Sequence, residues 1–193
     1  MATFWSTKGS DPKRKFRFQL EIPAVGGVND AIPVWTVKTV TKPKANIATV
    51  EHSFLQHTFK YPGRVTWDNI TVTLVDPADP NLAEVLLKKL HRSGYRSPNN
   101  RSQQAAAGAS TISKKASIDA LGQIYLSMTD ETGNIIERWS LYNPWIVSID
   151  FGGQLDYTSD DMAEITVELA FDWADFSKTG KAPGEILSRN TLR

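Results

Sequence analysis

The sequence contains no cysteine, which excludes both a disulfide scaffold and a thiolate metal site. It also lacks an excess of charge of either sign, because 22 lysines and arginines stand against 21 aspartates and glutamates. A dedicated nucleic-acid-binding protein usually carries a marked basic excess, so this balance argues against that class. No apolar run approaches the roughly 18 residues of a membrane helix, and the N-terminal residues lack the order of a signal peptide. We therefore expect a cytoplasmic product with no membrane partner.

Histidine is scarce too, and the three present are His52, His57 and His91. On one continuous strand His52 and His57 would face opposite ways, because they are an odd number of positions apart. No serine lies in a nucleophile elbow, and neither glycine pair, Gly26-Gly27 or Gly152-Gly153, opens a helix as a phosphate-binding loop does. We expect no catalytic residue, no cofactor and no metal ion, and hence no enzyme.

Alternation of apolar and polar residues dominates the chain, and this is the period of strands with one buried face. Some seven or eight such segments are separated by turns rich in Gly, Pro, Asn or Asp. One segment, residues 80–93, has a helical stripe instead; Asp79 is its candidate N-cap and Pro80 its first helical residue. We therefore predict a mainly β protein, an antiparallel β-sandwich or barrel-like fold with one α-helix at about 80–93.

Three polar segments have too few large apolar residues to form a core of their own. We assign residues 1–12 to an N-terminal arm, residues 95–117 to a long loop and residues 174–193 to a C-terminal tail. The β-domain then comprises residues 13–173, including the helix and the long loop.

Residues 46–61 are predicted to form an extended hairpin or long ribbon. Large apolar side chains lie in this otherwise polar stretch, as in a segment that is covered only on assembly. The candidate intersubunit residues are Phe54, Leu55, Phe59 and Tyr61. The alternative is that these side chains lie in the core of the same molecule.

The segment AEITVELAFDW, residues 163–173, is predicted to form one long strand with a buried face. Its other face carries Glu164, Glu168 and Asp172, and no cation lies among them in the sequence.

Two stretches resemble a known family: VTWDNITVTLVDPADPN at 65–81, and WIVSIDFGGQLDYTSDDMAEITVELAFDWADF at 145–176. The first is a strand that runs through an acidic turn into the helix, and the second pairs two strands across an acidic turn. Together they resemble the tail tube proteins of contractile-tailed bacteriophages, a superfamily that includes type VI secretion tubes. The order of elements matches from about residue 13 to residue 173, and the N-terminal FWSTKGSDPKRKFRF is similar to the start of such proteins. The loop at 95–117 and the tail after 173 make this a longer version.

The resemblance implies a structural virion protein whose barrel-like protomers close into hexameric rings. The rings stack into a tube inside a sheath, and the tube conducts DNA during genome ejection. Implied partners are further copies of the chain, the sheath, baseplate and terminator proteins, and the tape-measure protein and DNA in the lumen. The protein would be assembled in the host cytoplasm and end in the virion tail. A baseplate tube-initiator of the same fold, or a tube protein of a contractile injection or type VI secretion system, remains an alternative.

The acidic strand face has a role in such a tube. A wall that lets DNA slide should lack cationic clusters, because each phosphate contact adds binding. Glu164, Glu168 and Asp172 are therefore the candidate lumen-facing residues, and a solvated outer face is the alternative. Two rival classes, a small-ligand barrel and a nucleic-acid-binding barrel, need convergent polar groups or a basic face, and the sequence shows neither.

Overall fold

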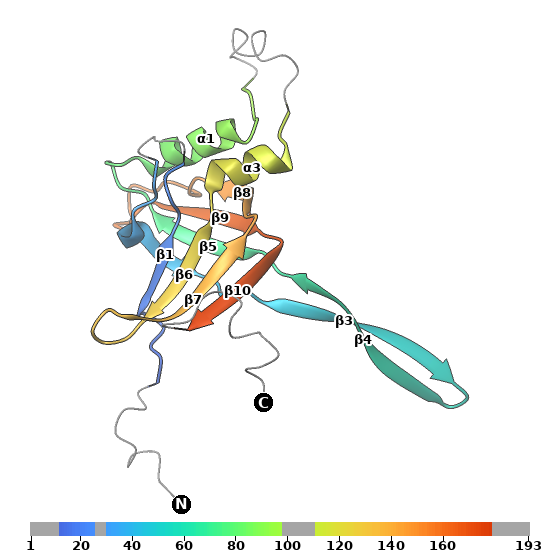
Figure 1. Ribbon diagram of the computed structural model, residues 1–193. Helices are drawn as coiled ribbons and strands as arrows, with labels where there is room; N and C mark the ends of the chain where they lie inside the picture. Colours follow the sequence, from blue (N-terminus) through green and yellow to red (C-terminus); the bar gives the residue numbers. More distant parts are fainter. Residues whose placement is uncertain (1–11, 26–29, 98–110, 179–193) are drawn as a thin grey trace, which may run out of the picture.

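The computed structural model describes residues 12–25, 30–97 and 111–178 (Figure 1). Within these ranges the chain forms two four-stranded antiparallel sheets, a separate two-stranded ribbon, a short 3-10 helix and two α-helices. This confirms the prediction of a mainly β, antiparallel fold. The expected N-terminal arm, apart from Pro12, lies outside the described residues.

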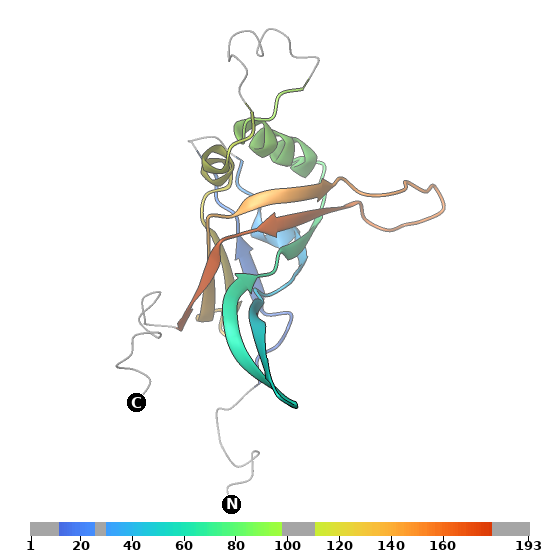
Figure 2. The ribbon, with the colours of Figure 1, turned by 90° about the vertical axis from the view of Figure 1, so that its right-hand side faces the viewer.

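The two four-stranded sheets face each other and their strands cross, as the two views show (Figures 1 and 2). The first sheet has the order β1-β6-β7-β10 and the second the order β2-β5-β9-β8. The strands of the first are β1 (Phe18–Glu21), β6 (Ile124–Thr129), β7 (Ile135–Tyr142) and β10 (Trp173–Lys178). Those of the second are β2 (Val37–Val40), β5 (Ile70–Val75), β8 (Trp145–Asp150) and β9 (Glu164–Ala170), with the 3-10 helix η2 (Val34–Thr36) just before β2.

The core between the sheets is formed by the apolar side chains that alternate with polar ones along the strands. On β5 and β9 the register pairs Ile70 with Leu169, Val72 with Val167 and Leu74 with Ile165. All six side chains are buried. Full burial of a side chain of this size stabilises the fold by about 1.5–3 kcal/mol, so a shift by one residue, which would expose all of them, is strongly disfavoured.

The predicted helix is present as α1 (Leu82–Arg92), but its start differs from the prediction. Asn81, not Asp79, is the N-cap residue, and its side chain accepts a hydrogen bond of 3.0 Å from the amide of Glu84. Pro80 therefore precedes the helix instead of occupying its first turn. The apolar stripe faces the core, where Leu82, Val85 and Leu86 are buried.

A second helix, α3 (Lys114–Leu121), begins inside the segment that we assigned to a loop at 95–117. Ser113 caps it by accepting a hydrogen bond from the amide of Ala116 at 3.2 Å. The helix buries Ala120 and Leu121, too few large apolar residues for a clear stripe in the sequence. The prediction was therefore wrong for this part, and residues 98–110 lie outside the described chain.

The predicted single strand at 163–173 is two strands in two sheets. Strand β9 ends at Ala170 in the second sheet, and β10 begins at Trp173 in the first. Trp173 is 43% exposed and stacks on Tyr142, so it does not continue the buried face. Strand β10 also pairs with β7 as far as Lys178, so the β-domain continues beyond residue 173. Residues 179–193 of the expected tail lie outside the described residues.

Candidate functional site

The predicted ribbon is present as β3 (Ala45–Phe54) and β4 (His57–Trp67), which pair only with each other in the described structure and project from the body (Figures 1 and 2). The exposed fractions of Phe54, Leu55, Phe59 and Tyr61 are 61%, 89%, 49% and 55%. The alternative that these side chains belong to the core of the same molecule is therefore wrong. Large apolar side chains that stand together in water mark a contact surface.

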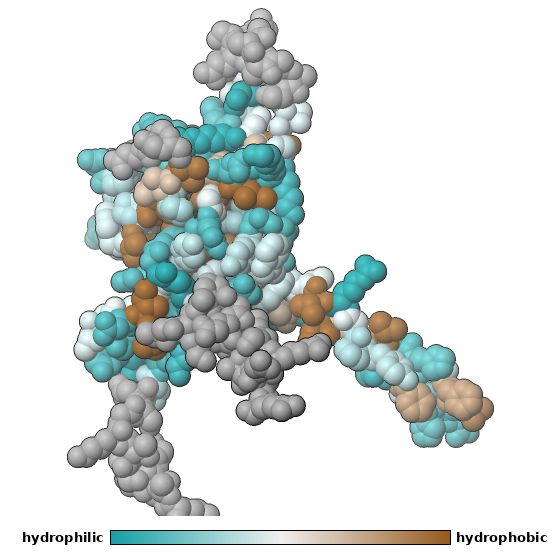
Figure 3. Space-filling view, in the orientation of Figure 1, coloured by the Kyte–Doolittle hydropathy of each residue, from teal (hydrophilic) through white to brown (hydrophobic). Residues whose placement is uncertain are grey.

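One face of the ribbon carries most of these apolar side chains. The register places Val50 beside Tyr61, and Phe59 beside His52, on that face. His57 lies on it too, opposite Phe54, because the chain reverses at Leu55 and Gln56. The two histidines thus share a face, contrary to the expectation for one continuous strand. Hydrophobic side chains gather at both the base and the tip of the ribbon (Figure 3).

Contacts at the base of the ribbon hold its two strands together and pack it against the body. The carboxylate of Asp68 pairs with the ammonium group of Lys44 at 2.9 Å and accepts a hydrogen bond from Asn46. The hydrogen bonds from Lys44 and Asn46 hold the pKa of Asp68 below its ordinary value. Trp67 packs against Phe171 with 5.9 Å between ring centroids. The ribbon therefore leaves the body in a defined direction.

A second carboxylate, Glu137 on β7, links the first sheet to the base of the ribbon. It is 4% exposed and pairs with Lys13 and with Lys42, which lies between β2 and β3. Burial raises the pKa of Glu137, but the hydrogen bonds from the two ammonium groups outweigh it, and the pKa is lowered.

We expect Glu137→Gln to destabilise the protein at pH 7 by about 1.5–3 kcal/mol, the range for hydrogen bonds to charged groups. Because the folded-state pKa of Glu137 is lowered, its contribution is present above the ordinary value of 4.5 and is lost as the pH falls through the folded pKa. Urea denaturation of both proteins at pH 7 and at successively lower pH values measures this. The difference should shrink in acid; a difference that does not vary with pH would contradict the assignment. Glu131→Gln is the control. Glu131 is largely exposed, and its ion pair with Arg17 is long, at 3.6 Å, so it should contribute little to stability.

The solvent face of the second sheet is polar and slightly acidic. Its hydroxyl-bearing side chains come from all four strands, and the register aligns Thr39, Thr73 and Thr166 across three of them. The charged residues on this face are Lys38, Asp150, Glu164 and Glu168.

The acidic residues of this face are not free of partners, although the sequence shows no cation near them. Glu164 forms an ion pair with Lys38 from β2, a strand far away in the sequence. Glu168 accepts hydrogen bonds from Asn69 at 2.9 Å and from Ser148 at 3.3 Å. With three carboxylates and one lysine, the face as a whole remains negative.

Asp172 lies elsewhere, at the corner where the chain passes from β9 to β10. Its carboxylate contacts Lys114 of α3 at 2.7 Å and Asn143 at 2.8 Å. These hydrogen bonds, the one from Lys114 first, lower the pKa of Asp172. The prediction that Asp172 shares the face of Glu164 and Glu168 assumed a continuous strand, and the corner breaks that continuity.

The outer strands of the second sheet, β2 and β8, have no strand partner on their outer sides in the described structure. Each neighbouring pair in this sheet is antiparallel, so β2 and β8 run in opposite directions. Open edges of this kind are templates for pairing with another chain.

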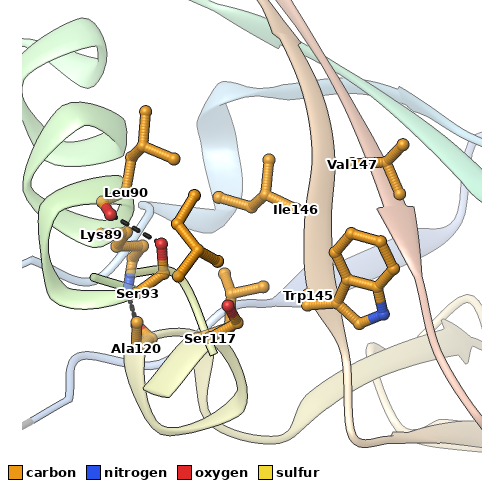
Figure 4. Close-up of a pocket in the computed structure, with 10 residues that line it drawn as sticks. Lys89, Leu90, Ser93, Ser117, Ala120, Trp145, Ile146 and Val147 are labelled. Atoms are coloured by element: carbon orange, nitrogen blue, oxygen red, sulfur yellow. Dashed lines mark hydrogen bonds between the residues drawn. The ribbon is translucent and has the colours of Figure 1, made fainter. Parts of the chain in front are cut away.

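No metal site accompanies these surfaces in the part of the chain that the structure describes. No three histidines or carboxylates gather there in a way that would hold a metal ion. A cavity of about 220 Å³ between α1, α3 and β8 is mostly apolar (Figure 4). It is smaller than the roughly 300–1,000 Å³ of typical small-molecule sites. Among the described residues no helix has the length and apolarity to span a membrane.

Open sheet edges, a projecting ribbon with exposed apolar side chains and a polar sheet face are typical of a structural β protein that associates with other chains. The family model for the T4-like virus tail tube protein gp19 matches residues 14–174. The chain belongs to this family, and it is a tail tube protein of a contractile tail or injection system. This confirms the resemblance seen in the sequence. The family is one of structural tube proteins, and the prediction that this chain catalyses no reaction stays a prediction.

Solved structures share the fold at low sequence identity. A chain in the sheath-tube complex of the PVC extracellular contractile injection system has a TM-score of 0.60 and 18% identity, covering 93% of this chain and 100% of that one. A chain in the anti-feeding prophage baseplate has a TM-score of 0.58 and 12% identity, covering 89% and 99%. A chain in the cap of that prophage has 0.57 and 18%, covering 93% and 100%. No curated protein matches the chain.

Proposed function

We propose that copies of this chain pair head to tail through β2 and β8 into closed hexameric rings, and that the rings stack into the inner tube of a contractile phage tail. The tube is the conduit for viral DNA and holds the tape-measure protein before ejection. In this proposal the chain is the repeating subunit of the tube, and its final location is the virion tail.

The observation that carries this proposal is the direction of the edge strands. Four strands that alternate in direction leave β2 and β8 antiparallel to each other. A rotation about a ring axis places β2 of the next copy beside β8, and the alternation then continues across the boundary. Closing the ring leaves no open edge in this sheet, which removes the hazard of unlimited strand pairing.

Six copies of a four-stranded sheet make a 24-stranded barrel. Such a barrel is wider than the 16–18-stranded porins, which already enclose an aqueous channel. The number six follows from the family resemblance, and the similar baseplate chain comes from an assembly described as 6-fold symmetrised.

In this arrangement the polar face of the second sheet lines the lumen. Its threonines and its net negative charge offer DNA no cationic cluster to bind. Glu164 and Glu168 are the lumen-facing residues of the proposal. Asp172 is at the corner of the sheets, so we place it at the margin of this surface.

The partners in the proposal are the sheath outside the tube, and the baseplate and terminator proteins at its ends. The fold occurs in chains of a sheath-tube complex, a baseplate and a tube-terminating cap. A subunit of this fold can therefore stack on proteins of the same fold at both ends of the tube.

Negative-stain microscopy of the purified protein tests the proposal. We expect hollow tubes of stacked rings with sixfold symmetry, at lengths that increase with protein concentration. Single rings that never stack would favour a baseplate tube-initiator. A chain that remains monomeric at every concentration would contradict the proposed function.

Replacing Glu164 and Glu168 together with lysine tests the lumen. We expect tubes to form and genome ejection to slow several-fold, more so at low salt, because cations on the wall attract phosphates over a Debye length of roughly 8 Å. The rate of DNA release from virions measures this. Glu131→Lys is the control, because Glu131 is largely exposed on the turn between β6 and β7. Unchanged ejection with failed sheath attachment would show that this face points outward.

A further inference from the structure

The cavity between α1, α3 and β8 opens as an apolar groove, which we call the β8 groove (Figure 4). Ile112, Trp145 and Val147 on its margin are 55%, 38% and 42% exposed. Leu90 of α1 lies on the opposite side from β8. The groove therefore offers a partly open apolar surface to another protein segment.

Lys89, the one lysine that lines the groove, already has partners within its own molecule. The ammonium group of Lys89 lies 3.2 Å from the carbonyl oxygen of Pro23, 3.5 Å from that of Ala120 and 3.7 Å from the carboxylate of Asp30. Its side chain is buried. The groove therefore has no free cation for an anionic ligand, and an apolar segment fits it better.

The base of the ribbon carries an apolar pair, Ile47 and Val65, which lie opposite each other on β3 and β4. They are 62% and 56% exposed. The ribbon follows β2, at one edge of the second sheet, whereas the groove adjoins β8, at the other edge. The pair and the groove of one molecule therefore belong to opposite sides of the sheet.

We propose that the β8 groove of one copy receives Ile47 and Val65 of the next copy in the same ring. This inference rests on the head-to-tail ring proposed above. In an antiparallel boundary the end of β2 at Val40 lies beside the start of β8 at Trp145. Only residues 41–44 separate β2 from the ribbon, so the base of the ribbon lies against the next copy near its groove.

The tip of the ribbon lies too far away to use the same groove. Leu55 is eight positions beyond Ile47, which at ~3.3 Å per residue is roughly 26 Å. The ribbon therefore has two contact regions. Only its base is within reach of the groove of the adjacent copy, and its tip is free to contact another surface.

Cross-linking tests this division, and the natural chain has no cysteine to interfere. Subunits with Val147→Cys are mixed with subunits with Ile47→Cys, assembled, and treated with a short bifunctional thiol reagent. We expect a dimer band that is absent from each variant alone and from a mixture of Val147→Cys with Leu55→Cys. Tubes that give no such band, or the same yield with Leu55→Cys, would overturn the inference while the ring remains. If the unchanged chain forms no rings, the proposed function itself fails.

The unassembled Val147→Cys subunit tests whether a segment of the same chain fills the groove instead. We expect its thiol to react quickly with a maleimide in the monomer and at least tenfold more slowly in the tube. Slow reaction already in the monomer would show that the same chain covers the groove, and would overturn the inference.

A charge exchange tests the contact without cysteine. Val147→Asp and Ile47→Lys should each lower the tube yield at least tenfold, because each buries a lone charge against an apolar surface. Both changes in one chain should restore much of the yield, since each groove then receives an opposite charge. Val147→Asp with Leu55→Lys is the matched control and should restore nothing. Equal yields from the two double variants would contradict the pairing.

Discussion

Replacing Asp30 with alanine is expected to lower the free energy of unfolding by about 3–5 kcal/mol, the range for breaking a buried ion pair. Asp30 is fully buried and Lys89 is 1% exposed. Without Asp30 the charge of Lys89 would remain in the interior beside another cation, Arg92. Burial, the largest cause, already lowers the pKa of Lys89, and the charge of Asp30 opposes that shift.

Asp30 also holds the backbone that precedes β2 against α1. Its carboxylate accepts a hydrogen bond from the amide of Val25 at 3.0 Å and pairs with Arg92. Arg92 in turn donates to the carbonyl oxygen of Val25 at 2.8 Å. The substitution therefore removes the hydrogen-bond acceptor of the Val25 amide and one partner of Arg92, which adds to the cost of the lysine left without its counter-charge.

Urea denaturation of the unassembled subunit at pH 7 measures this loss. The control is Asp30→Asn combined with Lys89→Met, which removes both charges and should lie much closer to the natural protein than Asp30→Ala. A second control is Asp119→Ala, because Asp119 is largely exposed, pairs with the exposed Lys115 and should change stability by less than about 1 kcal/mol. A loss below 1 kcal/mol for Asp30→Ala would show that the cluster is not essential to the fold.

Replacing Phe54 and Leu55 together with serine should abolish tube assembly and leave the subunit folded. Both side chains are exposed at the tip of the ribbon, so the isolated subunit loses no core packing. In an assembled tube the change removes two large apolar contacts, each about 1.5–3 kcal/mol when buried. A loss of 3 kcal/mol or more per subunit contact corresponds to roughly a hundredfold or greater rise in the concentration needed for assembly.

Sedimentation and negative-stain microscopy over a range of protein concentrations measure the effect. Ser53→Ala with Thr58→Ala is the matched control, because these residues form a pair on the polar face of the same ribbon. The control should assemble like the natural chain. Normal tubes from the serine variant would mean that the tip takes no part in assembly.

Segments whose own residues decide their structure were predicted well. The alternation in β5 and β9 places Val72 and Val167 in the core whatever their neighbours are. The ribbon was also predictable, because the residues around Phe54 and Phe59 are polar and could not be buried in a core. The start of α1 was predicted less well, because Asp79 and Asn81 are both good caps and only the packed backbone selects one.

Features that depend on distant residues were missed. Helix α3 has a weak apolar stripe and is stabilised by packing against α1 and β8, which no local pattern reveals. Glu164 looked unpaired because Lys38 is 126 positions away. The β8 groove could not be foreseen either, since its walls come from three separated segments.

The sequence by itself determined the class of fold, the ribbon, and the family, because periodicity and motif order are local properties of the chain. Only the tertiary structure decided where the last long strand divides. The alternation continues through Phe171 and Asp172, yet the chain changes sheets there, with Asp172 held by Lys114 and Asn143. It also decided that β2 and β8 are antiparallel open edges. Strand order results from which faces pack together, and that free energy arises only when distant segments meet.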